Sequence, residues 1–456
     1  MDFLRDKFVL AGAKTIFFCA NIEIETELCR QTAILIRNDG GVMEIVIKNG
    51  RVIDPKTGRD EIMDLLIVDD KIACIQAQIS TDQREVIDAN GMIVSPGFID
   101  LHVHLREPGF EFKETIYTGS RACAKGGYTS VFCMPNTKPA LDTKETLQAL
   151  KERIQKDSVI GIYPVGAITQ GIKGEVLTDH SELYLSGVKA LSDDGRTTMN
   201  PDHMRKAFEA SKKLNIPVMT HSEDHDLTER LKGEIYPPKA EYEIVYRDIN
   251  LCAEVGGKLH VSHVSTKEAA NAINEARTNH VKVTCEVAPH HFALSDKNVD
   301  MTSTLSKVNP PIRSEEDRKA MIAAIKLGWV DAIATDHAPH EASSKETNYE
   351  NASFGISGIE TAFGVSYQTL VIDENIPLIK VLSLLTYQPA QIGGLENEGV
   401  IEAGYYANLV ILDLESKWQV ISNQFISKGK NTPFEGMQLQ GEVVRTIYRG
   451  KTVYER

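Results

Sequence analysis

Two histidines separated by one residue are the first candidates for chemistry in this sequence. They lie in residues 98–105, an apolar stretch that ends before the turn-forming pair Pro108-Gly109. In a strand, residues i and i+2 face the same side, so His102 and His104 would project together. Two imidazoles placed in this way can hold one metal ion, and imidazole suits zinc and its neighbours. Arg106 continues the same alternation, so its cation would face whatever the metal holds.

Further polar residues follow short apolar runs later in the chain. His221 ends one such run, although a hydrogen-bonded core histidine is an alternative interpretation there. His260 and His263 are three residues apart, so a strand cannot present both on one face. Asp336 ends another apolar run, where a carboxylate must be paired, bound to a metal or shifted in its pKa. These positions supply the ligand types that a metal site needs.

The middle of the chain, residues 95–397, alternates between strand-like and helix-like runs. The strand-like runs cover residues 97–104, 129–134, 159–166, 187–191, 216–221, 258–263, 281–287 and 331–336, and helical patterns between them include 143–154, 201–214, 267–278 and 315–327. This alternation predicts a (β/α)8 barrel of the TIM type, an α/β fold. Catalytic residues of such barrels lie at the C-terminal ends of the strands, where the candidate residues above also fall.

The two ends of the chain have a different pattern from the middle. Residues 43–94 and 398–456 contain short strand-like runs, with Asn49-Gly50 and Asn90-Gly91 as turn signals. We expect both ends to build one small β-sandwich. Residues 1–42 fit neither part, and we expect them to be an N-terminal extension that is not part of the fold.

Composition and charge limit the classes of partner. With 42% hydrophobic and 25% charged residues, the 456-residue chain has an ordinary globular composition. The net charge of −14 argues against a nucleic-acid surface, and no apolar run has the 18 or so residues of a membrane span. The seven cysteines are scattered without a Cys-x-x-Cys motif, which is typical of a reducing compartment. We therefore expect a cytoplasmic protein that binds neither nucleic acid nor membrane.

A set of motifs in fixed order resembles a known family. The motifs are Met134-Pro-Asn-Thr137, Ser192-Asp-Asp-Gly195, Thr220-His-Ser-Glu223, His260-Val-Ser-His-Val-Ser265, Asn309-Pro-Pro311 and Thr335-Asp-His-Ala-Pro-His340. Together with the His-x-His pair they resemble the amidohydrolase superfamily over residues 44–456. The run Leu105-Arg-Glu-Pro-Gly109 resembles the bacterial long-chain dihydroorotases within that superfamily.

The resemblance implies two divalent metal ions per chain, with zinc the expected metal. One ion would be held by His102, His104, Asp194 and Asp336, and the other by Asp194, His221 and His263. The motif selects His263 and leaves His260 structural. Many amidohydrolases use a carboxylated lysine as the bridging ligand, so Lys189 stays open as a second candidate beside Asp194. Two metals would activate water and polarise an amide carbonyl, and Asp336 would move the proton.

The resemblance also implies the substrate contacts. Arg106 and Asn136 would bind a free carboxylate of the substrate, with His340 completing that pocket. Arginine suits this role because it forms bidentate pairs with carboxylates. Asn309 would hydrogen-bond the substrate ring, and Phe354-Gly355 would do so through backbone groups.

The implied reaction is the reversible cyclisation of N-carbamoyl-L-aspartate to (S)-dihydroorotate and water, a step of pyrimidine biosynthesis. Two alternatives remain open. An allantoinase or hydantoinase would share the barrel and the His-x-His pair, but its substrate lacks the ring carboxylate. A non-catalytic partner of aspartate transcarbamoylase should have lost metal ligands, which this sequence retains. A homodimer and a complex with that transcarbamoylase are both compatible with the resemblance.

The remaining histidines are expected to have other roles. His290 and His291 are adjacent, so a strand would point them in opposite directions, and we expect both to be structural. His337 is expected to pack beside Asp336 or orient it. His180, His203, His225 and His280 lie in polar stretches and are expected at the surface. The polar residues 341–349 are expected to form a loop beside the pocket.

Overall fold

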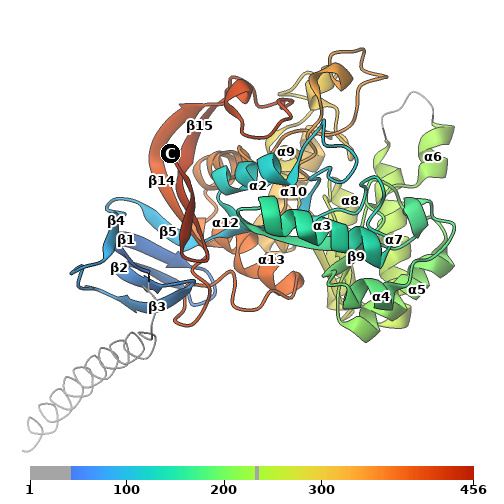
Figure 1. Ribbon diagram of the computed structural model, residues 1–456. Helices are drawn as coiled ribbons and strands as arrows, with labels where there is room; N and C mark the ends of the chain where they lie inside the picture. The colour runs from blue at the N-terminus through green and yellow to red at the C-terminus, as the bar shows by residue number, and fades with distance from the viewer. Residues whose placement is uncertain (1–42, 232–235) are drawn as a thin grey trace, which may run out of the picture.

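The computed structural model describes residues 43–231 and 236–456 of the chain (Figure 1). A barrel fills most of the molecule, and a separate sheet lies against one side of it. The prediction about residues 1–42 lies outside the described residues.

The barrel is a sheet of eight parallel strands that follow one another in sequence order. They are β6 (Phe98–Val103), β7 (Tyr128–Cys133), β8 (Gly161–Ala167), β9 (Ala190–Ser192), β10 (Val218–Thr220), β11 (Leu259–Val261), β12 (Val283–Val287) and β13 (Ala332–Ile333). Every strand-like run predicted in the middle of the chain overlaps one of them. The predicted TIM-type barrel is confirmed.

The first and last strands meet at a seam that nearly closes the barrel. Val103 and His337 form an isolated parallel bridge there. The buried carboxylate of Asp100 accepts hydrogen bonds from the backbone N–H of Thr335 at 3.1 Å and from its hydroxyl at 2.6 Å. It also accepts the N–H of His102 at 3.0 Å. One side chain therefore ties the strand that carries the His-x-His pair to the segment that carries Asp336.

Helices surround the barrel and connect its strands. They are α2 (Ile116–Lys125), α3 (Lys144–Asp157), α4 (His180–Leu185), α5 (Pro201–Leu214), α6 (His225–Arg230), α7 (Pro238–Val255), α8 (Lys267–Thr278), α9 (Pro289–Ala293), α10 (Glu315–Leu327), α11 (Ala362–Ser366), α12 (Leu378–Leu385) and α13 (Tyr387–Ile392). The predicted bounds of α5, α8 and α10 are confirmed. Each begins after a side chain that caps the first turn: Asn200, Thr266 and Ser314.

Both ends of the chain contribute to the second sheet, as predicted. Its strands are β1 (Glu44–Asp54), β2 (Arg59–Val68), β3 (Lys71–Gln76), β4 (Glu85–Asp88), β5 (Ile93–Pro96), β14 (Leu409–Gln419), β15 (Gln438–Tyr448) and β16 (Lys451–Glu455). The order is β16-β15-β14-β5-β1-β2-β3, and β4 pairs with β1. Figure 1 shows the blue N-terminal strands and the red C-terminal strands side by side.

One turn prediction in this sheet was wrong. Asn49-Gly50 was read as the turn between two strands, but β1 continues through it. The pairing of β1 with β2 shifts register between Ile47 and Gly50, and Asn49 has a left-handed φ of 60°. These are the features of a β-bulge, which needs the same residue types as a tight turn. The second signal, at Asn90-Gly91, is a turn.

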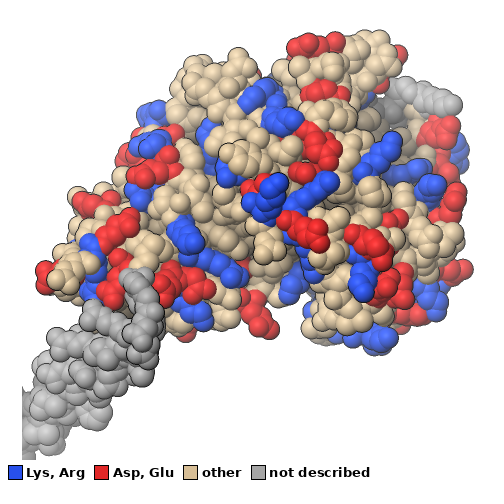
Figure 2. Space-filling model, in the orientation of Figure 1, with Lys and Arg blue, Asp and Glu red and all other residues tan. Residues whose placement is uncertain are grey.

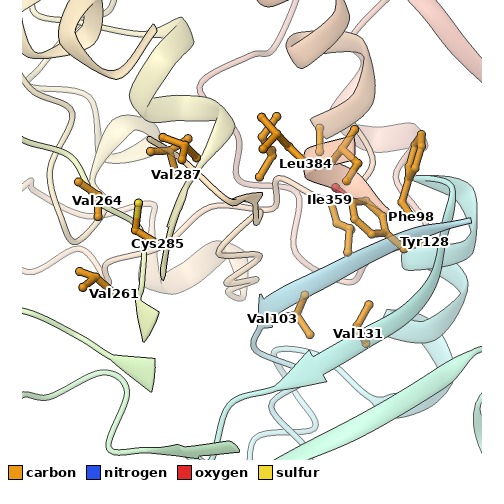
Figure 3. Packing of buried hydrophobic residues seen from close by; sticks show 14 of the residues in the cluster. Phe98, Val103, Tyr128, Val131, Val261, Val264, Cys285, Val287, Ile359 and Leu384 are labelled. Carbon is orange, nitrogen blue, oxygen red and sulfur yellow. The ribbon is translucent and has the colours of Figure 1, made fainter. Parts of the chain in front are cut away.

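The largest buried cluster fills the space between the barrel and the elements around it. Phe98 packs edge-on against Tyr128, with 5.6 Å between ring centroids, and stacks on Phe363 of α11 at 5.5 Å. Figure 3 shows Phe98 and Tyr128 next to Ile359 in this cluster. Because β14 and β15 also contribute Val410 and Val443, the cluster joins the small sheet to the barrel.

The surface carries charges of both signs. On the face in Figure 2, Lys and Arg side chains are interspersed with Asp and Glu. Among the described residues, no helix has the length and apolarity needed to cross a membrane.

Candidate metal centre and substrate pocket

The histidines and aspartates predicted as metal ligands come together at the C-terminal ends of the barrel strands. Ligand atoms of His102, His104 and Asp336 lie within 4.8 Å of one another, and so do those of His102, Asp194 and His263. His221 joins this cluster, because its Nδ1 lies 3.1 Å from His263 Nε2. The residues come from five different strands, which is the usual construction of a TIM-barrel site.

Asp194 lies at the centre of the cluster. Its Oδ1 is 3.3 Å from His102 Nε2, 3.6 Å from His263 Nε2 and 3.8 Å from His221 Nδ1. Its Oδ2 is 3.4 Å from His104 Nε2. One carboxylate therefore reaches all four imidazoles, which is the arrangement that a ligand shared by two ions requires.

Two buried atoms at the centre of the cluster suit a bound cation. His102 Nε2 and Asp194 Oδ1 face each other, and neither has a hydrogen-bond partner in the part of the chain that the structure describes. Buried polar atoms are almost always paired, so unpaired ones need an explanation. Imidazole nitrogens and carboxylate oxygens are the donors that zinc and related divalent ions prefer. The residues present therefore fit a metal site.

The charge of the aspartates also suits a cation. Burial by itself would raise the pKa of Asp194, but the contacts with His102, His263 and His104 together outweigh it and lower the pKa well below its usual range. Burial is likewise outweighed at Asp336, whose pKa His104 lowers. Both carboxylates are therefore ionised at neutral pH, the form that binds metal.

Three residues of the site have left-handed backbone conformations. The φ angles are 64° for Arg106, 36° for His263 and 48° for Asp336. Left-handed φ is uncommon for residues other than glycine and clusters at functional sites. Each of the three follows the end of a barrel strand, where the chain turns sharply and the side chain is directed over the barrel.

The second nitrogen of three candidate ligands contacts an oxygen. His102 Nδ1 lies 3.0 Å from Glu286 Oε1, and His104 Nδ1 lies 2.9 Å from Asn136 Oδ1. His221 Nε2 lies 3.3 Å from Glu223 Oε2. Such partners fix the tautomer and the orientation of a metal-binding imidazole.

Glu223 and Glu286 contribute to the site but were not predicted from the sequence. A signal for Glu286 was present, because it is a carboxylate in the apolar strand β12. Asp336 was selected because a carboxylate in an apolar strand must be paired, bound to a metal or shifted in its pKa, and the same reasoning applies to Glu286. Glu223 stands inside a quoted motif but was not assigned a role.

The two candidates for the bridging ligand lie at opposite ends of β9. Lys189 precedes its first residue, whereas Asp194 follows its last residue by two positions. Asp193, next to Asp194, accepts hydrogen bonds from Thr169 and Thr198. It therefore supports the loop ahead of Gly195.

Arg106 and His340, which were predicted to bind a carboxylate, lie together with Lys113 beside the cluster, and we call these three residues the cationic pocket. Arg106 Nη2 lies 3.2 Å from His340 Nε2, and Arg106 Nε donates to the carbonyl of Pro339 at 3.2 Å. Lys113, which the sequence analysis did not select, donates to His340 Nδ1 at 3.3 Å. Burial lowers the pKa of Arg106 to about 10, so its guanidinium stays charged at neutral pH.

The predicted ring contacts lie next to this pocket. Asn309 Nδ2 donates to Glu223 Oε2 at 3.0 Å, and its Oδ1 has no partner among the described residues. The carbonyl of Phe354 accepts from His340 Nε2 at 2.7 Å, and the Gly355 N–H donates to Lys307 O at 3.0 Å. The half-exposed Phe354 ring lies under the Lys307 ammonium.

One of the remaining histidines was predicted wrongly. His180 was expected at the surface, but it is buried, with its Nε2 3.1 Å from Ile168 O. The short helix α4, which begins at this residue, turns the ring inward. His290 and His291 are buried after β12, and His337 is buried at the seam. The segment 341–349 lies beside the pocket, where its Lys345 donates to Lys307 O and Ser353 O.

Residues 93–453 match the amidohydrolase family, and the chain belongs to this family. Amidohydrolases are metal-dependent, in keeping with the histidine and aspartate groups that could hold metal here.

Within the family, the similar curated proteins are dihydroorotases. The dihydroorotase of Pelotomaculum thermopropionicum is 43% identical over 426 residues, which covers 91% of this chain and 99% of that protein. The dihydroorotase of Ruminiclostridium cellulolyticum is 40% identical over 425 residues, which again covers 91% of this chain and 99% of that protein. That of a Thermoanaerobacter species is 42% identical, with 91% and 98% covered.

Solved structures agree with the fold. The L-hydantoinase (dihydropyrimidinase) of Arthrobacter aurescens superposes with a TM-score of 0.84 at 24% identity, covering 91% of this chain and 96% of that one. A D-hydantoinase from Bacillus sp. AR9 gives 0.82 at 26% identity, with 90% and 95% covered. At 24% identity, the likeness to the L-hydantoinase shows the fold alone.

Proposed function

We propose that this protein is a dihydroorotase, which interconverts N-carbamoyl-L-aspartate and (S)-dihydroorotate in pyrimidine biosynthesis. The observation that carries the proposal is the position of a cationic pocket, formed by Arg106, Lys113 and His340, directly beside the cluster of histidines and aspartates. The cluster suits cleavage or formation of an amide, and the pocket suits a substrate with a free carboxylate. Relatives named dihydroorotase at about 40% identity support the same conclusion.

The cluster would hold two divalent ions, with zinc as the expected metal. His102, His104, Asp194 and Asp336 form one set of ligands, and Asp194, His221 and His263 form the other. When bound, such ions lower the pKa of water and polarise a carbonyl. The four imidazoles and the buried aspartates hold the reacting groups in a fixed geometry and keep bulk water away.

Asp336 would transfer the proton between water and the ring nitrogen. Its Oδ1 faces His104 Nε2 at 3.1 Å and His102 Nε2 at 3.6 Å, which leaves Oδ2 for the proton. A carboxylate in this position can accept a proton in one direction of the reaction and return it in the other.

The pocket would orient the substrate by its carboxylate. Arg106 and Lys113 provide two positive charges, and a guanidinium can pair with both carboxylate oxygens. Asn136, which is held by His104, adds an amide to the same wall. Asn309 and the Phe354-Gly355 backbone lie where they could contact the ring. Hydantoin and allantoin have no ring carboxylate that could pair with these two cations.

The cellular setting belongs to the same proposal. Cys123, Cys133, Cys252 and Cys285 are buried thiols, which is typical of a reducing compartment such as the cytoplasm. Size-exclusion chromatography of the protein, alone and with an aspartate transcarbamoylase, would test a homodimer and a mixed complex.

The decisive experiment is an assay of the purified protein on dihydroorotate, allantoin and hydantoin, with metal content measured on the same sample. We expect preference for dihydroorotate and about two metal ions per chain, as a shared carboxylate implies. Preference for allantoin or hydantoin would keep the metal centre but contradict the carboxylate pocket. Bound metal without activity on any of the three would favour a non-catalytic partner of the transcarbamoylase.

A further inference from the structure

A series of polar side chains runs from the metal cluster through the barrel interior and ends at the half-buried Thr284. Glu286 on β12 is 1% exposed, and its two oxygens contact different histidines. Oε1 lies 3.0 Å from His102 Nδ1, and Oε2 lies 3.0 Å from His260 Nε2. His260 Nδ1 in turn lies 2.8 Å from Thr284 Oγ1. Thr284 and Glu286 are two residues apart on one strand, so they face the same side.

The donor and the acceptor of each hydrogen bond in this series of side chains can be assigned. An ionised carboxylate only accepts hydrogen bonds, so both histidines must donate to Glu286. His102 therefore carries its proton on Nδ1, which leaves the lone pair on Nε2. That nitrogen is the unpartnered atom that faces Asp194. His260 carries its proton on Nε2, so its Nδ1 accepts from the hydroxyl of Thr284.

We propose that Glu286 is a positioning residue of the metal centre, and that His260 and Thr284 hold it in place. Glu286 touches neither the proposed metal nor the substrate. It acts by fixing the tautomer and the ring orientation of His102. The inference deepens the proposed function, because it rests on the two-metal site described there.

The strand pairing makes this connection rigid. Thr284 is the backbone partner of His260 in the register of β11 and β12. Glu286 reaches from β12 across the barrel to β6, which no strand pairing joins to β12 in the described sheet. The side chains therefore link His102 to β12 and β11, which lie beyond β13 in the described sheet and share no backbone pairing with β6.

Metal affinity is the quantity that tests this role. Metal-free protein is titrated with Zn²⁺ against a competing chelator, and the visible absorption of the Co²⁺-loaded protein reports the ligand geometry. Glu286→Ala should bind metal about 10- to 100-fold more weakly, the usual effect of losing such a partner. Its Co²⁺ spectrum should also change, because the His102 ring can rotate.

An isosteric variant separates hydrogen bonding from charge. In Glu286→Gln the amide oxygen can still accept from His102 Nδ1, and the amide N–H can donate to His260 once that ring changes tautomer. We expect Glu286→Gln to fold, to keep the Co²⁺ spectrum close to that of the wild type, and to bind metal more tightly than Glu286→Ala.

A matched control is available elsewhere in the barrel. Glu398 is also a buried carboxylate, and it accepts from Ser130 Oγ at 2.5 Å and Tyr163 Oη at 2.6 Å. Glu398→Gln should leave metal affinity and the Co²⁺ spectrum unchanged, even if the protein melts at a lower temperature.

The outcomes distinguish this inference from the function that it rests on. If the wild type binds metal and Glu286→Ala binds it equally well with an unchanged spectrum, Glu286 only fills the core and the inference fails alone. If the wild type binds no divalent metal, the metal centre fails and takes the inference with it.

Discussion

Single residues set the charge of the substrate pocket. Lys113 donates to His340 Nδ1, so the other nitrogen of that ring must carry the proton, and it faces the carbonyl of Phe354. Burial, together with Arg106 and Lys113, lowers the pKa of His340 to about 2. The ring is therefore neutral at working pH, and the positive charge of the pocket comes from Arg106 and Lys113.

Substitutions of the two cations should affect substrate binding to different extents. Arg106→Ala removes a charged, bidentate partner, which costs roughly 1.5–3 kcal/mol or about 10- to 100-fold in KM for dihydroorotate. Lys113→Met keeps the length of the side chain but removes one positive charge and the hydrogen bond to His340. We expect roughly a fivefold rise in KM for dihydroorotate. Steady-state kinetics with metal analysis measures both.

Bound metal should be unchanged in both variants, because neither residue is a proposed ligand. A normal KM for Arg106→Ala would remove Arg106 from the carboxylate role. A metal loss in Lys113→Met would show that the residue supports the cluster instead.

Much of the site could be predicted at this scale, because alternation along a strand fixes which side chains share a face. His102 and His104 follow directly from that rule. The ring nitrogen that each histidine presents could not be predicted. His221 presents Nδ1 because Glu223 occupies its Nε2, and that contact depends on how the chain turns after β10.

At the scale of elements, the closing seam depends on one buried carboxylate. Asp100 accepts three hydrogen bonds, two from Thr335 and one from the backbone of His102. In the part of the chain that the structure describes, β6 and β13 are not paired as strands. The isolated Val103–His337 bridge and the hydrogen bond from the His104 N–H to the His337 carbonyl lie just after β13. The seam is therefore the place where the barrel should open most easily.

Asp100→Ala should destabilise the protein by about 3 kcal/mol, because it leaves three buried donors without partners. Urea unfolding followed by circular dichroism measures the change. Glu209→Ala is a suitable control, since Glu209 is exposed and pairs only with the exposed Lys206. Its effect should stay within about 0.5 kcal/mol. Equal effects of the two substitutions would contradict the importance of the seam.

Helices and barrel strands were more predictable than the small sheet. The ends of α5, α8 and α10 are marked by capping residues, which act locally. The strands β1 and β14 have 11 residues each, whereas only short strand-like runs were expected at the chain ends, because tertiary pairing extends both strands beyond their apolar cores. The bulge at Asn49-Gly50 uses turn residues inside a strand, and only the pairing with β2 distinguishes the two uses.

At the scale of the whole molecule, the described residues of the barrel and the small sheet account for both layers of the fold. The first strand of the small sheet begins at Glu44, and every proposed site residue comes later. The dihydroorotase of Pelotomaculum thermopropionicum aligns over 99% of its length with 91% of this chain. We therefore propose that the unit that folds and works begins near Met43.

A chain that begins at Met43 should have the same melting temperature as the full chain and the same turnover of dihydroorotate, within about twofold. Differential scanning calorimetry and the standard assay test this. Loss of solubility or activity in the shortened chain would show that residues 1–42 contribute to the fold or to an assembly.

The position of β5 has a consequence for how the chain is made. β5 hydrogen-bonds to β1 on one side and to β14 on the other. During translation that second edge has no partner until the ribosome has completed the barrel and reached Leu409. Open strand edges pair readily with neighbouring chains. A ribosome that stalls shortly before Leu409 therefore leaves a nascent chain whose barrel sequence is complete. Its unpaired β5 edge can then bind other copies of the chain.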